Sequence, residues 1–377
     1  MSNLLAPRRP QGRLLARRLD YGLLVTTLVV AVIGVIIVYS ATRSALLLAG
    51  DSPHYFLDRQ AAYVVVGSVV MVVLAAVDYR WLEHAAWLLY VGLILALLSV
   101  FVIGSTAEGA TRWVQLGPVQ LQPSAFGAVV LVVVTAAFCV RRPEGLERRD
   151  LVRVLALVAV PILLVIKQPD LGSGIVMAIV LLVMLIVAGI PNRYLVLLVL
   201  TAVGGIAAII HFGLLQPYQV ARITSFLHQG RNGQTTTYNL RESVAAIGSG
   251  GFWGTGLFHG TQTNLSYVPE QQTDFIFSAV GEQLGFVGAS TVLVLLGIVA
   301  WRMLRVAQTT RDSFGRLLAT GCFTLIAFST FENAGMAMGI MPIAGIPLPF
   351  LSYGGSATVA FFAAVGVVLS VQLHRPR

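Results

Sequence analysis

The stretch PEQQTDFIF, residues 269 to 277, contains two carboxylates, Glu270 and Asp274, four residues apart where a long apolar run begins. A carboxylate at this position can accept a proton from a ligand hydroxyl, or it can cap the first turn of a helix. From the residues alone, Asp274 is therefore a candidate general base and equally a candidate N-cap. Glu270 and Thr273 are the candidate binding residues beside it.

The apolar run after Asp274 carries a second acid, Glu282. On one continuous helix, Asp274, Ser278, Glu282 and Gly285 share a face. An acid inside a membrane span costs several kcal/mol unless it meets water or a partner. Glu282 lies about two turns, roughly 12 Å, beyond Asp274. We therefore expect Asp274 at the polar end of this helix and Glu282 in a structural hydrogen bond.

The segment KQPDLG contains Lys167, the only lysine in the chain. A compact ammonium suits a phosphate group without the paired geometry of a guanidinium. A lysine at the end of a membrane helix can instead anchor that helix at the interface. Lys167 is a candidate cation for a phosphate, with Gln168 and Asp170 beside it, and the anchor is the alternative.

Further candidate binding residues lie in other loops. An indole such as Trp113, next to Arg112 in TRWVQLG, can contact a sugar or lie at headgroup level. Loop arginines can bind an anion or form a solvated face. Ser352 belongs to the stretch SYGGS, whose irregular backbone either lines a cavity or forms a hairpin between helices. The loop arginines are Arg222, Arg231 and Arg241.

The elements that carry these residues are membrane helices. The chain of 377 residues is 57% hydrophobic and 11% charged, with a mean hydropathy of +0.84. A bilayer core about 30 Å thick needs roughly 20 apolar residues per helix, and the chain offers about ten such windows. Tracts of about ten alternating residues, typical of a membrane β-barrel, are not found. We predict one all-α domain over residues 1–377, with spans at 21–41, 61–78, 85–104, 124–140, 151–168, 171–190, 193–212, 274–303, 314–338 and 355–373.

Ten spans put both chain termini on the same side of the membrane. Most of the 25 lysines and arginines lie in the tails and the even-numbered connections, beginning with the basic tail 1–20. Short loops rich in Lys and Arg remain cytoplasmic. We therefore expect cytoplasmic termini, a large extracytoplasmic loop over 212–273, and chemistry on the outer face. The same bias explains the net charge of +9, so no nucleic-acid partner follows from it.

Common catalytic and metal-binding templates do not occur. The sequence contains no GxSxG, HExxH or P-loop motif, and its 6 histidines have no ligand spacing. Cys139 and Cys322 both fall in apolar windows, which predicts packing rather than a disulfide or a metal site.

Several long motifs, in one order along the chain, resemble the SEDS proteins (shape, elongation, division and sporulation) of bacterial cell-wall synthesis. The segments IGSGG, HGTQ and GIPLPFLSYGGSA are more similar to the elongation branch, RodA, than to the division branch, FtsW. The motifs are RWVQLGPVQLQPS from Arg112, KQPDLGSG from Lys167, RITSFL from Arg222, YNLRESVAAIGSGGFWGTGLFHGTQ from Tyr238, VPEQQTDFIFSAVGEQLGFVG from Val268 and NAGMAMGIMPIAGIPLPFLSYGGSA from Asn333.

The resemblance implies a ten-helix protein of the bacterial cytoplasmic membrane that polymerises lipid II into glycan strands. It also implies a class B penicillin-binding protein and other membrane proteins of the elongation complex as partners. The aspartate of TDFIF is the essential residue of that family, which implies that Asp274 is the general base. Lys167, Arg112, Arg222 and Arg241 are then candidates to meet the departing diphosphate, with a divalent cation such as Mg²⁺ or Mn²⁺ as a possible aid.

The sequence departs from the family pattern at several positions. Ala125 and Ala128 stand where the family usually has a glutamate and a lysine, which puts a substrate role of that pair in doubt. Gln272 replaces a common histidine before Thr273. His228 and Gln229 stand where the family often has Asp-Pro, so we expect a different loop shape there.

Two other classes of function remain as alternatives. A lipid II flippase would use the polar residues as a passage, and a scaffold would only hold a penicillin-binding protein. A flippase needs polar groups that continue to the cytoplasmic side, whereas the acids and prolines of this chain gather in the outer half. A scaffold has little use for Asp274, Lys167 and Arg222 together. The sequence therefore favours the enzyme.

Overall fold

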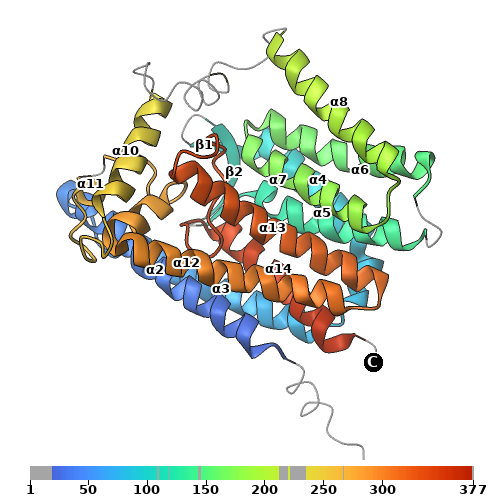
Figure 1. Cartoon of the computed structure of the whole chain (residues 1–377), viewed down its shortest axis with the longest axis horizontal. Helices are drawn as coiled ribbons and strands as arrows, with labels where there is room; N and C mark the ends of the chain where they lie inside the picture. Colours follow the sequence, from blue (N-terminus) through green and yellow to red (C-terminus); the bar gives the residue numbers. More distant parts are fainter. Residues whose placement is uncertain are drawn as a thin grey trace, which may run out of the picture.

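The computed structural model describes residues 19–107, 110–117, 119–142, 146–211, 220, 235–265 and 267–375. Each of the ten predicted spans coincides with a long helix in this part of the chain (Figure 1). The helices are α2 (Tyr21–Ala49), α3 (Tyr55–Ala76), α4 (Arg80–Ile103), α5 (Pro123–Val140), α6 (Arg148–Lys167), α7 (Leu171–Val187), α8 (Asn192–His211), α12 (Ile276–Thr309), α13 (Ser313–Ala337) and α14 (Gly355–His374).

Seven described helices are long and apolar enough to cross a membrane by length and composition: α2, α3, α4, α5, α12, α13 and α14. Helix α7 and residues 192–205 of α8 are shorter apolar helices. Helix α6 carries several charged residues in its first two turns. The chain is therefore a multi-pass membrane protein. Ten crossings with both termini on the cytoplasmic side remain a prediction.

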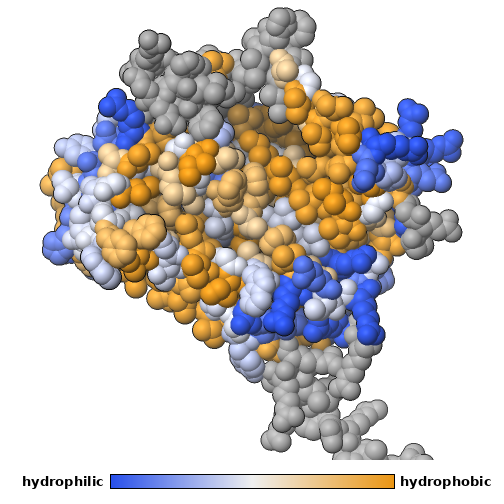
Figure 2. All heavy atoms as spheres, in the orientation of Figure 1, coloured by the Kyte–Doolittle hydropathy of each residue, from blue (hydrophilic) through white to orange (hydrophobic). Residues whose placement is uncertain are grey.

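The bundle is built around α14, whose residues from Ala360 to Val371 are all buried. Helix α14 packs along α3 and also contacts α5, α12 and α13. Helix α8 lies at the edge of the bundle (Figure 1): Tyr194, Leu195 and Leu198 pack against the core, whereas Val196, Leu197 and Leu200 are exposed. Figure 2 shows hydrophobic residues over the helix flanks and hydrophilic residues gathered toward the ends of the molecule. This distribution is the one that a lipid environment selects.

The connection between α4 and α5 forms a small antiparallel sheet, whereas an all-α chain was predicted. Its strands are β1 (Gly104–Ala107), β2 (Ala110–Leu116) and β3 (Val119–Leu121), in the order β1-β2-β3. Val114 pairs with Leu121, and Gly117 turns the chain between β2 and β3 with a φ of 61°. The strands in TRWVQLGPVQL are not predictable from the sequence, because strands this short give little periodic signal.

The predicted large loop over 212–273 contains helices in its described part. These are α10 (Thr235–Ser249) and α11 (Thr261–Asn264). Both lie at the end of the bundle where the sheet lies (Figure 1). Arg222, His228, Gln229 and Arg231 lie outside the described residues, as does most of the basic tail 1–20.

Helix α12 is interrupted at Gly285, so the predicted continuous polar face is wrong. Gly285 has φ 66° and ψ −167°, a conformation that is essentially restricted to glycine. The break frees the carbonyls of Glu282 and Gln283, which accept hydrogen bonds from the N–H groups of Thr255 (2.9 Å) and Gly256 (3.0 Å). The glycine-rich segment after α10 therefore completes the backbone hydrogen bonds of the broken helix.

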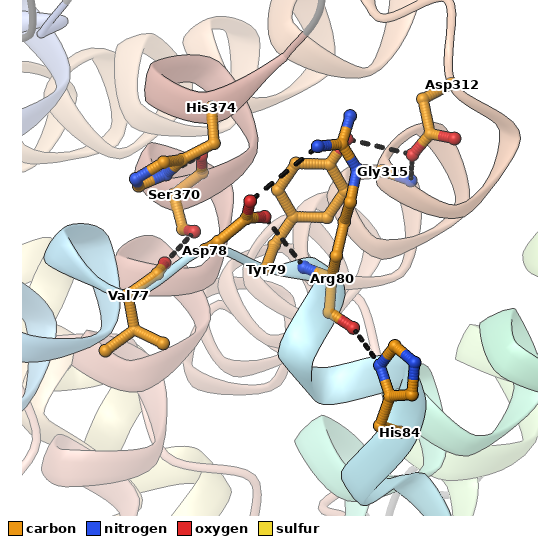
Figure 3. A network of polar contacts seen from close by, with 9 residues as sticks. All are labelled: Val77, Asp78, Tyr79, Arg80, His84, Asp312, Gly315, Ser370 and His374. Atoms are coloured by element: carbon orange, nitrogen blue, oxygen red, sulfur yellow. Dashed lines mark hydrogen bonds and ion pairs between the residues drawn. The ribbon is translucent and has the colours of Figure 1, made fainter.

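The opposite end of the bundle is held by a network of polar contacts (Figure 3). The Tyr79 hydroxyl donates to Asp312 Oδ2 (2.9 Å), and the same oxygen accepts from the N–H of Gly315 (2.8 Å). The Ser370 hydroxyl donates to the carbonyl of Val77. Burial, reinforced by the bond to Asp312, raises the pKa of the Tyr79 phenol to about 12. The network thus joins the connections α3–α4 and α12–α13 to α14.

Candidate functional site

A cavity of about 260 Å³ lies at the sheet end of the bundle and collects residues from across the chain. Its walls come from the start of α3, strands β2 and β3, the first two turns of α5, α7 and α14, the C-terminal half of α13, and the turn before α12. Five predicted site residues line it: Arg112, Trp113, Asp170, Thr273 and Asp274.

Asp274 is half-buried and lies in a turn before α12 rather than on the helix. Helix α12 begins at Ile276 with Phe275 as its N-cap, so the structure does not make Asp274 the N-cap. The N–H of Asp274 donates to the carbonyl of Glu270 (3.1 Å), and its own carbonyl accepts from Asn333 Nδ2 (2.7 Å). The backbone of Asp274 is therefore held by hydrogen bonds at both its N–H and its carbonyl, and Asp274 lines the cavity.

Glu270 shapes the turn that carries Asp274. Its φ of 51° is unusual for a residue with a side chain, and its carbonyl accepts from the N–H groups of Thr273 and Asp274 (both 3.1 Å). Glu270 Oε2 lies 3.3 Å from the Thr273 hydroxyl. Glu270 is not among the residues that line the cavity, whereas Thr273 is.

Asp170 is buried and joins the first turns of two helices. Its Oδ1 accepts from the N–H of Ser173 (3.2 Å), which caps α7. Its Oδ2 accepts from the hydroxyls of Ser124 (2.7 Å) and Ser173 (2.8 Å) and from Gln122 Nε2 (3.1 Å). The carboxylate is thus fully used in holding the cavity wall together.

Strand β2 brings Arg112 and Trp113 to the cavity, and the small sheet is packed against α4 and α5. Arg112 Nη2 donates to the carbonyl of Pro169 (2.6 Å), just before Asp170. Arg112 Nε has no hydrogen-bond partner within the described part of the chain. The guanidinium therefore keeps a donor for a group in the cavity.

Arg59 is the main cavity residue that the sequence analysis missed, together with Tyr63 and Tyr353. The Arg59 guanidinium lies over the Tyr55 ring (4.3 Å to the centroid) and hydrogen-bonds the Tyr353 phenol. Burial raises the pKa of Tyr353, in the connection between α13 and α14, to about 12. A signal existed, because Arg59 comes just before the predicted span 61–78 on the side where arginines are rare.

Several predicted binding residues do not line the cavity. Lys167 is exposed at the end of α6, and Arg241 is exposed on α10. Gln168 is buried and donates through Nε2 to the carbonyl of Leu97 (2.8 Å). The Ser352 hydroxyl accepts from the N–H of Leu348 (2.8 Å). Arg222 is outside the described residues.

The structural role expected for Glu282 is confirmed. Glu282 is fully buried, and its carboxylate accepts from the N–H groups of Gln262 and Thr263 (both 2.8 Å) at the start of α11. Ala125 and Ala128, which depart from the pattern of the resembling family, both line the cavity. Together with Leu325 and Phe361 they give it an apolar portion beside its polar residues.

The described residues contain no group of three His, Cys, Asp or Glu side chains that could hold a metal ion. Asp170 and Asp274 line the same cavity, but both oxygens of Asp170 already accept hydrogen bonds. These two acids therefore do not form an all-protein site for a divalent cation.

Known proteins match this chain over nearly its whole length. A family model for the FtsW, RodA and SpoVE cell cycle proteins matches residues 21–377. Stage V sporulation protein E of Bacillus subtilis (strain 168) is 34% identical over 359 residues, which cover 94% of this chain and 97% of that protein. Peptidoglycan glycosyltransferase MrdB of Escherichia coli (strain K12) is 34% identical over 359 residues, with 95% and 94% covered.

Two solved structures share the fold. One, from a study of how a peptidoglycan synthase complex coordinates polymerization and crosslinking, superposes with a TM-score of 0.80 at 29% identity and covers 94% of this chain and 97% of that one. The other, the rod shape determining protein RodA of Thermus thermophilus, has a TM-score of 0.70 at 27% identity, with 95% and 98% covered. The chain therefore belongs to the FtsW, RodA and SpoVE family of cell cycle proteins.

Proposed function

We propose that this chain is a peptidoglycan glycosyltransferase of the elongation type, which polymerises lipid II on the outer face of the bacterial cytoplasmic membrane. The observation that carries the proposal is the cavity, where the carboxylate residue Asp274 and two arginines, Arg59 and Arg112, meet. Relatives that match over more than nine-tenths of the chain, such as MrdB, are named peptidoglycan glycosyltransferases.

In the proposed reaction, the 4-hydroxyl of a GlcNAc residue on one lipid-linked glycan attacks the anomeric carbon of another. A bond forms between that oxygen and the anomeric carbon, and the bond from this carbon to the diphosphate oxygen breaks. The electron pair leaves with the polyprenyl diphosphate, and Asp274 takes the hydroxyl proton as general base. Cationic groups and N–H donors in the cavity stabilise the charge on the departing diphosphate.

The remaining cavity residues have supporting roles in this proposal. Arg112 and Trp113 bind sugar or phosphate oxygens from the sheet, and Thr273 adds a hydroxyl beside Asp274. Asp170 supports substrate binding only indirectly, because it holds the first turns of α5 and α7 in position. The exposed position of Lys167 supports its interpretation as an interfacial anchor.

The orientation of the chain follows from the basic residues. With ten crossings and cytoplasmic termini, the start of α12 and the cavity face outward, where lipid II meets the growing wall. The partner in this proposal is a class B penicillin-binding protein within an elongation complex of membrane proteins. A structural neighbour belongs to a peptidoglycan synthase complex, which supports such an assembly.

A lipid II flippase is less well supported. A passage would need polar groups from one face of the bundle to the other. The cavity is lined by helix starts at one end of the bundle, and its wall includes apolar side chains of Ala128, Leu325 and Phe361. A partly polar cavity confined to one end of the bundle suits a reaction at one membrane face.

The proposal is tested by reconstituting the full chain in liposomes with fluorescent lipid II, with and without a class B penicillin-binding protein. We expect glycan strands to form and to be digested by a muramidase. If lipid II remains monomeric under both conditions but reaches the opposite leaflet, the chain is a transporter and the proposal is wrong.

A further inference from the structure

Four helices, α5, α7, α12 and α14, begin at the cavity, and their N-termini differ in capping. Only α7 has a side-chain cap, from the Asp170 carboxylate, whereas α5, α12 and α14, whose N-cap is Gly354, have none. The first N–H groups of a helix lack intrahelical partners and carry partial positive charge. Gly354, Gly355 and Ser356 line the cavity, so the uncapped end of α14 faces into it.

A guanidinium lies beside this helix end. Arg59 hydrogen-bonds the phenol of Tyr353, the residue immediately before Gly354. Within the described residues, Arg59 forms no ion pair with a carboxylate. A guanidinium held by a phenol and an aromatic ring keeps N–H donors available for an anion.

A separate observation points to a ligand in the same cavity. Ser329 on α13 is 1% exposed and lines the cavity, but its hydroxyl has no hydrogen-bond partner among the described residues. Buried hydroxyls almost always have a partner. A polar group of a bound ligand would supply it.

The uncapped helix end is also held next to Asp274. The N–H of Tyr353 donates to the carbonyl of Gln272 (2.8 Å), two residues before Asp274. An anion at the start of α14 and a hydroxyl beside Asp274 would therefore be neighbours. This is the arrangement that a displacement needs, because the leaving group departs from the carbon that the hydroxyl attacks.

We propose that Arg59 and the N-terminus of α14, from Gly354 to Ala357, form the subsite that binds the diphosphate of the polyprenyl-linked substrate. The assignment rests on the proposed glycosyltransferase function. Several N–H groups at a helix start and one guanidinium match a diphosphate, which offers many acceptor oxygens and negative charge. Arg59 thereby takes the role expected of Lys167 and Arg241, neither of which lines the cavity.

The test measures binding of farnesyl diphosphate to the purified full chain in nanodiscs of neutral lipid, by titration calorimetry. Farnesyl diphosphate should bind the wild type, and Arg59→Gln should weaken binding at least about tenfold, because charge-assisted hydrogen bonds are lost. Arg59→Lys should retain part of the affinity. Arg43→Gln, which changes an exposed arginine outside the cavity, should bind as the wild type does.

Two further ligands identify the source of the anion. Farnesol lacks the diphosphate and should not compete, whereas inorganic pyrophosphate should compete weakly at the same site. If anionic phospholipid in the nanodisc abolishes the binding of farnesyl diphosphate, the site binds headgroups and the assignment is wrong. Unchanged affinity in a monodisperse Arg59→Gln protein would also overturn it. If the Arg59→Gln variant does not fold, unchanged affinity of the Arg59→Lys variant would overturn the assignment.

The subsite and the catalytic proposal can fail separately. Asp274→Asn should bind farnesyl diphosphate like the wild type while losing polymerisation. A wild type that binds the probe through Arg59 but never polymerises lipid II retains the subsite and loses the proposed function. If the wild type polymerises lipid II but binds the probe independently of Arg59, the proposed function is retained and the subsite is lost.

Discussion

The two ends of the helix bundle use their charged groups differently. At the end that carries the C-terminus, two acids form close ion pairs: Asp20, which also caps α2, pairs with Arg302, and Asp150 lies 2.6 Å from Arg142. At the cavity end, Arg59 and Arg112 form no ion pair with a carboxylate in the described chain. Charges that stabilise the fold are neutralised within it, whereas charges left open at a cavity are available to a ligand.

The largest expected effect tests whether the cavity end is a catalytic site. Asp274→Asn should lower the rate of glycan formation from labelled lipid II at least about 100-fold, because a carboxamide cannot accept the hydroxyl proton. The rate is measured in proteoliposomes with the penicillin-binding protein present. Asp58→Asn, at an exposed position near the start of α3, is the matched control and should keep full activity. If the Asp274→Asn variant is active, another group must be the general base.

The next effect tests the broken helix that shapes the cavity end. Gly285→Ala should destabilise the protein by about 3 kcal/mol or more, since its backbone conformation is restricted to glycine and a β-carbon would come 2.2 Å from Gly254 N. Thermal unfolding in detergent measures the change. Gly297→Ala lies in open space on the same helix and should be neutral or slightly stabilising. Equal effects of the two substitutions would show that the break carries no strain.

A smaller effect is expected from the one cavity carboxylate that serves the fold. Asp170→Ala should cost about 1–3 kcal/mol, because it removes the cap of α7 and leaves the buried hydroxyl of Ser124 without its acceptor. Asp170→Asn should recover part of this loss. The readout is the unfolding temperature together with the KM for lipid II. A change in kcat alone, with unfolding unaffected, would instead make Asp170 a direct participant in the reaction.

The smallest effect belongs to the opposite end. Tyr79→Phe removes the hydrogen bond to Asp312 and should cost about 1 kcal/mol without changing polymerisation. Because the folded protein raises the phenol pKa to about 12, the bond stabilises the fold below the ordinary pKa near 10 and weakens as pH rises toward 12. The difference in unfolding temperature between wild type and variant should therefore be constant from about pH 7 to 9 and shrink above about 10. A difference that grows at alkaline pH contradicts this account.

The positions of the helices were predictable because a lipid environment imposes one strong rule. Each helix must satisfy its own backbone and present roughly 20 apolar residues, so apolar windows alone locate the elements. The rule says little about short polar connections. For this reason apolar windows do not predict strands β1 to β3, and they do not predict the break at Gly285 in α12.

The candidate site was only partly predictable. The position of Asp274 at the start of an apolar run, and the loop that holds Arg112 and Trp113, can be read from the residues. Lys167 lies close to Asp170 in sequence, but the end of α6 turns its side chain to the exterior, whereas Asp170 caps α7 at the cavity. Neighbours in sequence can thus differ completely in exposure, one facing the exterior and the other buried at the cavity.

The sequence by itself determined that the chain crosses a membrane in apolar helices and that an acid stands where one of them begins. Only the tertiary structure placed Arg59 and that acid on the walls of one cavity, where a hydrogen bond from the Tyr353 N–H to the Gln272 carbonyl joins segments from distant parts of the chain. The length and apolar character of a segment are local properties, so they can be recognised in the sequence alone. The convergence of polar groups depends on how helices pack, which no local pattern encodes.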